Sequence, residues 1–153
     1  MEIERKFLVL QVPTNLDRFP QDDFLQGYIA LAEDGTEVRL RKIGDQYFET
    51  VKTGDGLARG EVEIDLTQQQ FDRLWALTEG RRIEKTRYRI DYEWVVIEVD
   101  VYRGKLNGLM TAEVEFESVA ASRSFEPPAW LGEEVTNDSR YQNKHLAVHG
   151  VPR

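Results

Sequence analysis

Charged side chains stand at every second position in several short segments of this sequence. The first of these segments carries Glu2, Glu4 and Lys6. A β-strand sends alternate side chains to one face, so these three groups would lie side by side. Carboxylate oxygens suit hard divalent cations, and guanidinium and ammonium groups bind phosphate oxygens. A face that holds both kinds of group could bind a polyphosphate together with metal ions.

The same alternation recurs along the chain and defines two sets of candidate residues. The acids are Glu2, Glu4, Glu61, Glu63, Glu98, Asp100, Glu113 and Glu115. The bases are Lys6, Arg39, Arg41, Lys52, Lys85 and Arg87. Apolar residues hold the intervening positions in most segments, as Val62 and Ile64 do in the segment that follows Gly60.

Alternation and turn residues together predict eight strands and two helices. The strands are residues 2–10, 24–31, 36–43, 46–53, 60–66, 82–92, 94–102 and 109–118. A helix is predicted over 67–79, where Thr67 and Gln70 have the spacing of a capping box. A second is predicted over 139–149, with Asp138 as its cap, and residues 120–128 are predicted to be a loop.

These elements predict a mainly β protein with some α-structure, in one domain over residues 1–153. Short connections between successive strands favour an antiparallel sheet, and closing that sheet into a barrel removes its exposed edges. Eight strands can close around a lumen that holds one small ligand. We therefore expect an eight-stranded closed barrel with helices packed outside.

The charged face could point in either direction. In a soluble barrel with an apolar interior, the charges would simply face water, and the protein would at most carry anions. However, like charges at adjacent in-phase positions repel one another, so a solvated face gains nothing from paired carboxylates. Convergence on metal ions explains the pairs. We therefore favour a barrel whose charges line a wet tunnel and whose apolar outer faces are covered by the two helices or by a second subunit.

Composition limits the class of partner. The 153 residues carry a formal net charge of -8, which argues against a nucleic-acid or anionic-membrane surface, because both need a basic footprint. No cysteine is present, so thiolate chemistry is excluded. No apolar run is long enough to span a bilayer. We expect a cytoplasmic protein that acts on a small molecule, without nucleic acid or membrane, and a homodimer is compatible with the apolar outer positions.

Several segments in this order resemble one family. They include Glu2-Ile3-Glu4-Arg5-Lys6, which is similar to an E-x-E-x-K signature, and the pairs Arg39 with Arg41, Glu61 with Glu63 and Glu113 with Glu115. Together they resemble the CYTH superfamily, the triphosphate tunnel metalloenzymes, over nearly the whole chain. The size of the chain resembles the short bacterial inorganic triphosphatases.

The resemblance implies metal-dependent hydrolysis of inorganic triphosphate to pyrophosphate and phosphate, with Mg²⁺ or Mn²⁺ as the cofactor. It implies that Glu2, Glu4 and Glu115 hold a metal. It gives Glu61, Glu63, Asp100 and Glu113 to a second metal or to the attacking water, with Glu63, Lys85, Asp100 and Glu113 as the catalytic group. The phosphate-binding residues would be Lys6, Arg39, Arg41, Lys52, Lys85 and Arg87.

The sequence also allows other functions. The family also contains class IV adenylate cyclases and thiamine triphosphatases, and a nucleoside triphosphate is a further possible substrate. A binding module that grips polyphosphate without hydrolysing it is the alternative outside the enzymes. Arg59, in a glycine-rich loop, could close over the substrate, and Tyr28 could orient a phosphate or simply pack.

Overall fold

A computed structural model describes residues 2–54 and 60–153 of the chain. Arg59 lies outside these described residues. The strands are β1 (Ile3–Val9), β2 (Gln21–Leu31), β3 (Glu37–Ile43), β4 (Gln46–Thr53), β5 (Gly60–Leu66), β6 (Arg82–Tyr92), β7 (Val95–Arg103), β8 (Met110–Phe116) and β9 (Leu131–Glu134). The α-helices are α1 (Gln68–Trp75), α2 (Val119–Ser124) and α3 (Asn143–His149), and short 3₁₀ turns are η1 (Leu16–Arg18), η3 (Ala76–Thr78), η4 (Gly104–Leu106) and η5 (Ser139–Tyr141).

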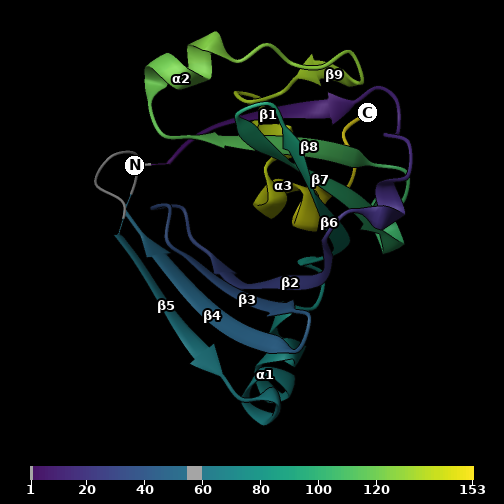
Figure 1. The fold of residues 1–153 in the computed structure, drawn as a ribbon. Coiled ribbons are helices and arrows are strands. Elements are labelled where there is room, and N and C mark those ends of the chain that lie inside the picture. The colour runs from purple at the N-terminus through teal and green to yellow at the C-terminus, as the bar shows by residue number, and fades with distance from the viewer. Residues whose placement is uncertain (1, 55–59) are drawn as a thin grey trace.

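The described strands form one antiparallel sheet in the order β5-β4-β3-β2-β6-β7-β8-β1-β9. The sheet bends so that β2 to β5 face β1 and β6 to β9 across the molecule (Figure 1). Within residues 2–54 and 60–153, β5 and β9 are the two edges and do not pair with each other. The prediction of a closed, eight-stranded barrel was therefore wrong, because the short β9 pairs with β1 and occupies the position through which β1 could have met β5.

The register places the predicted charged residues on one face of the sheet. Lys6 pairs with Glu113, and Glu98 pairs with Glu113 from the other side. In the other half, Lys52 lies between Glu37 and Glu61. Because each of these pairs is in phase, the alternating charges of all these strands share the inner, concave face. The predicted orientation of the charges is confirmed.

Apolar side chains cover much of the outer face. One cluster gathers residues such as Phe7, Ile97 and Val114 with Phe125, which follows α2. On the other half, Phe71 of α1 packs between Tyr47 and Trp75, with ring centroids 5.1 and 5.2 Å away. The predicted outer position of the first helix is confirmed.

The first helix also begins as its sequence predicts. Thr67 Oγ1 accepts a hydrogen bond from the Gln70 amide, and Gln70 Oε1 accepts one from the Thr67 amide. This is a complete capping box, which satisfies two of the free N–H groups at a helix start. The helix ends earlier than predicted, at Trp75, and continues as η3.

The end of the chain differs from the prediction. Gln142 is extended (φ -67°, ψ 141°), so it divides the predicted helix over 139–149 into η5 and α3. Asp138 caps η5 by accepting from the Arg140 amide, as expected. However, α3 packs against Tyr28, Ile83 and related side chains of the inner face and not against the outer one (Figure 1). The expectation that this helix covers an outer face was wrong.

Two further elements were missed. Residues 119–124 form α2, which Ser118 caps by accepting from the Ala121 amide, where a loop was predicted. Leu131–Glu134 form β9. No helix in the described parts of the chain is long and apolar enough to cross a membrane.

Candidate active site

The inner face surrounds a cavity of about 440 Å³. Side chains from both halves of the sheet and from the C-terminal segment line it. The predicted site residues among them are Glu2, Glu4, Lys6, Arg39, Arg41, Lys52, Glu61, Lys85, Arg87, Glu113 and Glu115. Glu63 and Asp100 are the two predicted site residues that do not line the cavity.

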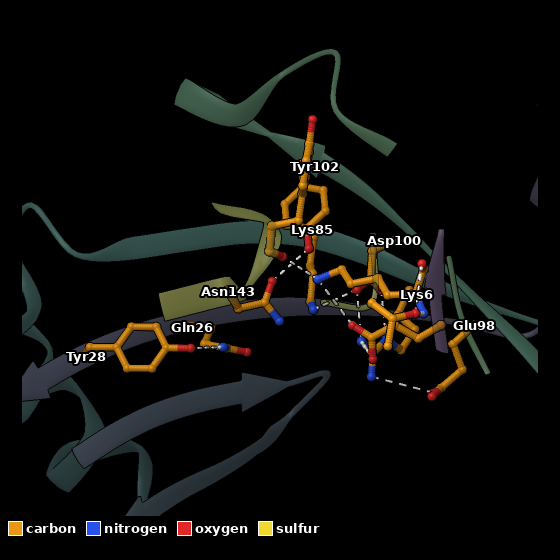
Figure 2. A network of polar contacts seen from close by, with 12 residues as sticks. Lys6, Gln26, Tyr28, Lys85, Glu98, Asp100, Tyr102 and Asn143 are labelled. Atoms are coloured by element: carbon orange, nitrogen blue, oxygen red, sulfur yellow. Dashed lines mark hydrogen bonds and ion pairs between the residues drawn. The ribbon is translucent and has the colours of Figure 1, made fainter. Parts of the chain in front are cut away.

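Asp100 lies beneath the cavity wall, where it anchors two cations. Lys85 Nζ donates to Asp100 Oδ2 at 2.8 Å, and Arg87 donates through Nε (2.7 Å) and a terminal nitrogen (2.8 Å). Both the Asp100 and Lys85 side chains are only 1% exposed. Figure 2 shows Lys85 and Asp100 directed toward each other. Both carboxylate oxygens of Asp100 therefore accept hydrogen bonds from protein donors.

The ionisation of this group follows from burial and pairing. Burial alone would raise the pKa of Asp100, but the Lys85 ammonium and Arg87 guanidinium outweigh it and hold this pKa well below its usual range. Burial lowers the pKa of Lys85 to about 8, although Asp100 opposes the shift. Asp100 is thus a fixed anion, and Lys85 is a cation whose charge depends on the partner beneath it.

Glu63 also points toward protein partners. Its Oε1 accepts a hydrogen bond from Thr50 Oγ1 at 2.8 Å and lies 3.8 Å from a terminal nitrogen of Arg41. The neighbouring acid, Glu61, lies 3.9 Å from Lys52 Nζ and lines the cavity. Of these two acids of β5, Glu63 therefore supports a cation and Glu61 faces the cavity.

The acids of β1 and β8 lie close to other acids, whereas Asp100 and Glu63 lie close to cations. Glu4 pairs in register with Glu115. Burial raises the pKa of Glu4, and the nearby carboxylates of Glu113 and Glu2 raise it further. Lys6 offsets only part of this effect. A bound cation would stabilise the ionised form of Glu4 among these neighbouring carboxylates.

The described residues nevertheless contain no cluster of three or more His, Cys, Asp or Glu side chains close enough to hold a metal ion by themselves. This agrees with the usual binding of Mg²⁺, which takes one or two carboxylates and completes its shell with water and substrate phosphates. The carboxylates present therefore fit a metal that the substrate helps to hold.

Several donors and acceptors at the cavity have no partner within the described chain. Arg39 Nε, Arg41 Nε and Gln26 Oε1 are buried without one. Burial and, to a smaller extent, the neighbouring Arg39 together lower the pKa of Arg41 to about 10. Unpaired buried donors are rare in proteins and costly. Their position in a cavity wall indicates a binding site for an anion.

Other cavity residues were not among the predicted site residues. Gln26, Tyr28 and Glu37 line it, and Gln26 Nε2 donates to the Tyr28 hydroxyl at 2.9 Å (Figure 2). Burial raises the pKa of Tyr28 to about 12. The alternation in β2 could have indicated two of them, because Gln26 and Tyr28 are in phase with each other. In the sheet, Gln26 pairs with Arg41 and Tyr28 pairs with Arg39.

The C-terminal segment contributes the remaining wall, which the sequence could not place. Lys6 Nζ donates to the Tyr141 carbonyl at 2.6 Å. The Tyr102 hydroxyl donates to Asn143 Oδ1 at 2.7 Å, as Figure 2 shows. Asn143 and Lys144 both line the cavity. These contacts hold α3 against the inner face.

The concave face of this bent antiparallel sheet carries a set of cations opposite a set of carboxylates, a charge arrangement that suits a polyphosphate together with a metal ion. Residues 1–150 match the CYTH domain, and the chain belongs to this family. The resemblance stated from the sequence is confirmed.

Curated relatives support this assignment. The chain is 49% identical over 149 residues to an inorganic triphosphatase of Nitrosomonas europaea, a match that covers 96% of this chain and 97% of that protein. It is 38% identical over 125 residues to an inorganic triphosphatase of Acetivibrio thermocellus, covering 80% and 78% of the two chains.

Solved structures show the same fold. A crystal structure of an inorganic triphosphatase aligns with a TM-score of 0.82 at 44% identity, covering 99% of this chain and 97% of that one. A conserved protein of Pyrococcus furiosus aligns with a TM-score of 0.55 at 18% identity, covering 80% and 83%, which extends the likeness in fold alone.

Proposed function

We propose that this protein hydrolyses inorganic triphosphate to pyrophosphate and phosphate with a divalent metal. The single observation that carries the proposal is the cavity wall, in which the buried Nε donors of Arg39 and Arg41 lack a partner in the described chain and the carboxylates of β1 and β8 line the same cavity. The two curated relatives named as inorganic triphosphatases support the choice of substrate. CYTH triphosphatases are metal-dependent, and Mg²⁺ or Mn²⁺ suits oxygen ligands of this kind.

The cations would bind the phosphate oxygens and neutralise their charge. Lys6, Arg39, Arg41, Lys52, Lys85 and Arg87 are the proposed set. Phosphoryl transfer depends mainly on positioning and on stabilising negative charge, and fixed cations contribute to both. Asp100 would act by holding Lys85 and Arg87 in place, which its contacts support better than metal ligation.

The carboxylates would serve the other half of the reaction. Glu2, Glu4 and Glu115 are the proposed metal ligands, with Glu61 as a further candidate. When bound, the metal supplies charge neutralisation at the phosphates and a lowered pKa for water. Glu113 lies 3.5 Å from Lys6 and 3.9 Å from Arg87, and this position beside two proposed phosphate-binding cations supports a role in orienting the attacking water. Glu63 would support Arg41. The oxygen of a water molecule bonds to the terminal phosphorus as the bridging P–O bond breaks; pyrophosphate leaves with the electron pair of that bond, and the proton of the water passes to solvent.

The proposal is tested by phosphate release from tripolyphosphate with Mg²⁺ or Mn²⁺, with and without a chelator. Glu4→Gln should reduce turnover strongly, since it removes one charge from the proposed metal site. Glu84→Gln is the matched control, because Glu84 is an exposed acid of β6 that lies 3.5 Å from Arg103, outside the cavity. Metal-loaded protein that leaves tripolyphosphate intact would refute the proposal.

Product analysis separates the alternatives. Formation of cyclic AMP from ATP would indicate a cyclase. Tight binding of tripolyphosphate without turnover would indicate a binding module. Faster hydrolysis of thiamine triphosphate or of a nucleoside triphosphate would indicate an organic substrate.

A further inference from the structure

One aromatic side chain lies among the charged residues of the inner face. Phe24 belongs to β2, where it is in phase with Gln26 and Tyr28 and pairs in register with Lys85. It is 6% exposed and does not line the cavity, so it lies beneath the charged wall. No motif in the sequence singled it out.

Three of the proposed phosphate-binding cations surround this ring. The guanidinium carbon of Arg41 lies 5.8 Å from the Phe24 ring centroid, and that of Arg87 lies 5.2 Å away. Lys85 Nζ lies 5.3 Å from the same centroid. The cations come from β3 and β6, the two strands on either side of β2.

The ring has an electrostatic task in this position. Cations gathered at one place repel one another, and Arg87 and Arg39 both lower the pKa of Arg41. Asp100 compensates Lys85 and Arg87, but it does not hydrogen-bond to Arg41. Arg41 instead lies at the long distance of 3.8 Å from Glu63. The negative face of an aromatic ring attracts a cation most strongly where water is excluded.

We propose that Phe24 is a positioning residue, whose ring is the shared platform that keeps Arg41, Lys85 and Arg87 directed at the phosphates of the substrate. The inference rests on the proposed function. It adds that the affinity of this site for a triphosphate depends on the electron density of a buried ring that never touches the substrate.

A ring could also occupy this place only to fill space, and the two roles predict different results. A space-filling residue is replaced by another apolar side chain of similar volume at little cost in binding. A platform for cations loses its effect when the ring is removed or made electron-poor. Adding fluorine to the ring weakens its negative face while changing its shape very little.

The experiment replaces Phe24 by Leu and by phenylalanines with one, two and five ring fluorines. Two readouts are measured: KM and kcat for tripolyphosphate with Mg²⁺, and Kd for diimidotriphosphate, an analogue with nitrogen in both bridging positions. We expect KM and Kd to rise stepwise with fluorine number and to reach about tenfold for Phe24→Leu. The same substitutions at Phe71 are the control, because Phe71 packs on Trp75 and Tyr47 and no described cation lies over its ring.

Each outcome decides the matter. A stepwise rise at Phe24 with no trend at Phe71 supports the platform. Flat values across the fluorinated series, in an enzyme that still hydrolyses tripolyphosphate, overturn it and leave the proposed function intact. A wild-type protein that neither binds the analogue nor hydrolyses tripolyphosphate overturns both.

Discussion

Replacing Asp100 by Asn tests whether this residue anchors cations or holds a metal. The side chain is 1% exposed and accepts three hydrogen bonds, from Lys85 and twice from Arg87. Removing one partner of a buried ion pair costs about 3–5 kcal/mol, because the remaining charge is left without compensation. The Asn amide group would also direct a donor toward cations that are themselves donors.

The expected loss can be read as a melting temperature. For a chain of this size, 1 kcal/mol corresponds to about 2–4 °C, so Asp100→Asn should lower Tm by roughly 6–20 °C. Thermal unfolding is followed by circular dichroism in a chelator, so that no metal contributes. Glu98→Gln is the matched control on the same strand and face. Glu98 is 31% exposed and lies 3.6 Å from Arg87, so its loss should cost about 1 kcal/mol or less.

The opposite result would refute the anchoring role. If Asp100 served mainly as a metal ligand, its negative charge would be unfavourable beside the other acids in metal-free protein. Asp100→Asn would then leave Tm unchanged or raise it in the chelator. It would lower Tm relative to wild type only when Mg²⁺ or Mn²⁺ is added.

Three further predictions concern affinity and stability. Because burial lowers the pKa of Lys85 to about 8, this group loses its charge as pH rises through 8, and Kd for diimidotriphosphate should increase between pH 7 and 9.5. Lys85→Arg stays charged and should remove this increase in Kd. An increase that persists in Lys85→Arg would exclude Lys85 as its source. Thr67→Ala breaks the capping box of α1 and should cost about 1 kcal/mol in urea unfolding, whereas an unchanged midpoint would show that the cap contributes nothing. Tyr102→Phe removes the hydrogen bond to Asn143 and should lower the free energy of unfolding by about 1–3 kcal/mol. It should also loosen α3, which would be measured as faster amide exchange over residues 143–149. Exchange equal to wild type would show that apolar packing alone holds the helix.

The sequence predicted the charged face because strand period is a local property. Alternation alone placed Glu61 and Glu63 on one side of β5 and Val62 and Ile64 on the other, and pairing of neighbouring strands then brought the faces together. The alternation could not distinguish the role of Glu98 from that of Asp100. Both are in-phase acids of β7, and only the depth of packing makes Asp100 an anchor.

The features that sequence missed depend on contacts between distant segments. Closure of the sheet was expected because closure removes edges, but nothing in Leu131–Glu134 indicates that it would pair with β1. The inner position of α3 depends on Leu146 and Ala147 meeting Tyr28 and Tyr102, more than forty residues away in each case. An amphipathic pattern predicts that one side of a helix packs against the protein. It does not predict which face of the sheet the helix packs against.

The open sheet has a consequence for solubility. β5 is an edge strand on which six of seven residues are exposed, including Val62 at 63% and Ile64 at 51%. Such an edge can pair with another copy of the chain, and charged side chains are the usual protection against it. Glu61, which lines the cavity, and Glu63, which contacts Arg41, would therefore also keep molecules apart. Neutral variants at these positions should aggregate more readily, especially in acid, so their specific activities need to be referred to the monomer that remains in solution.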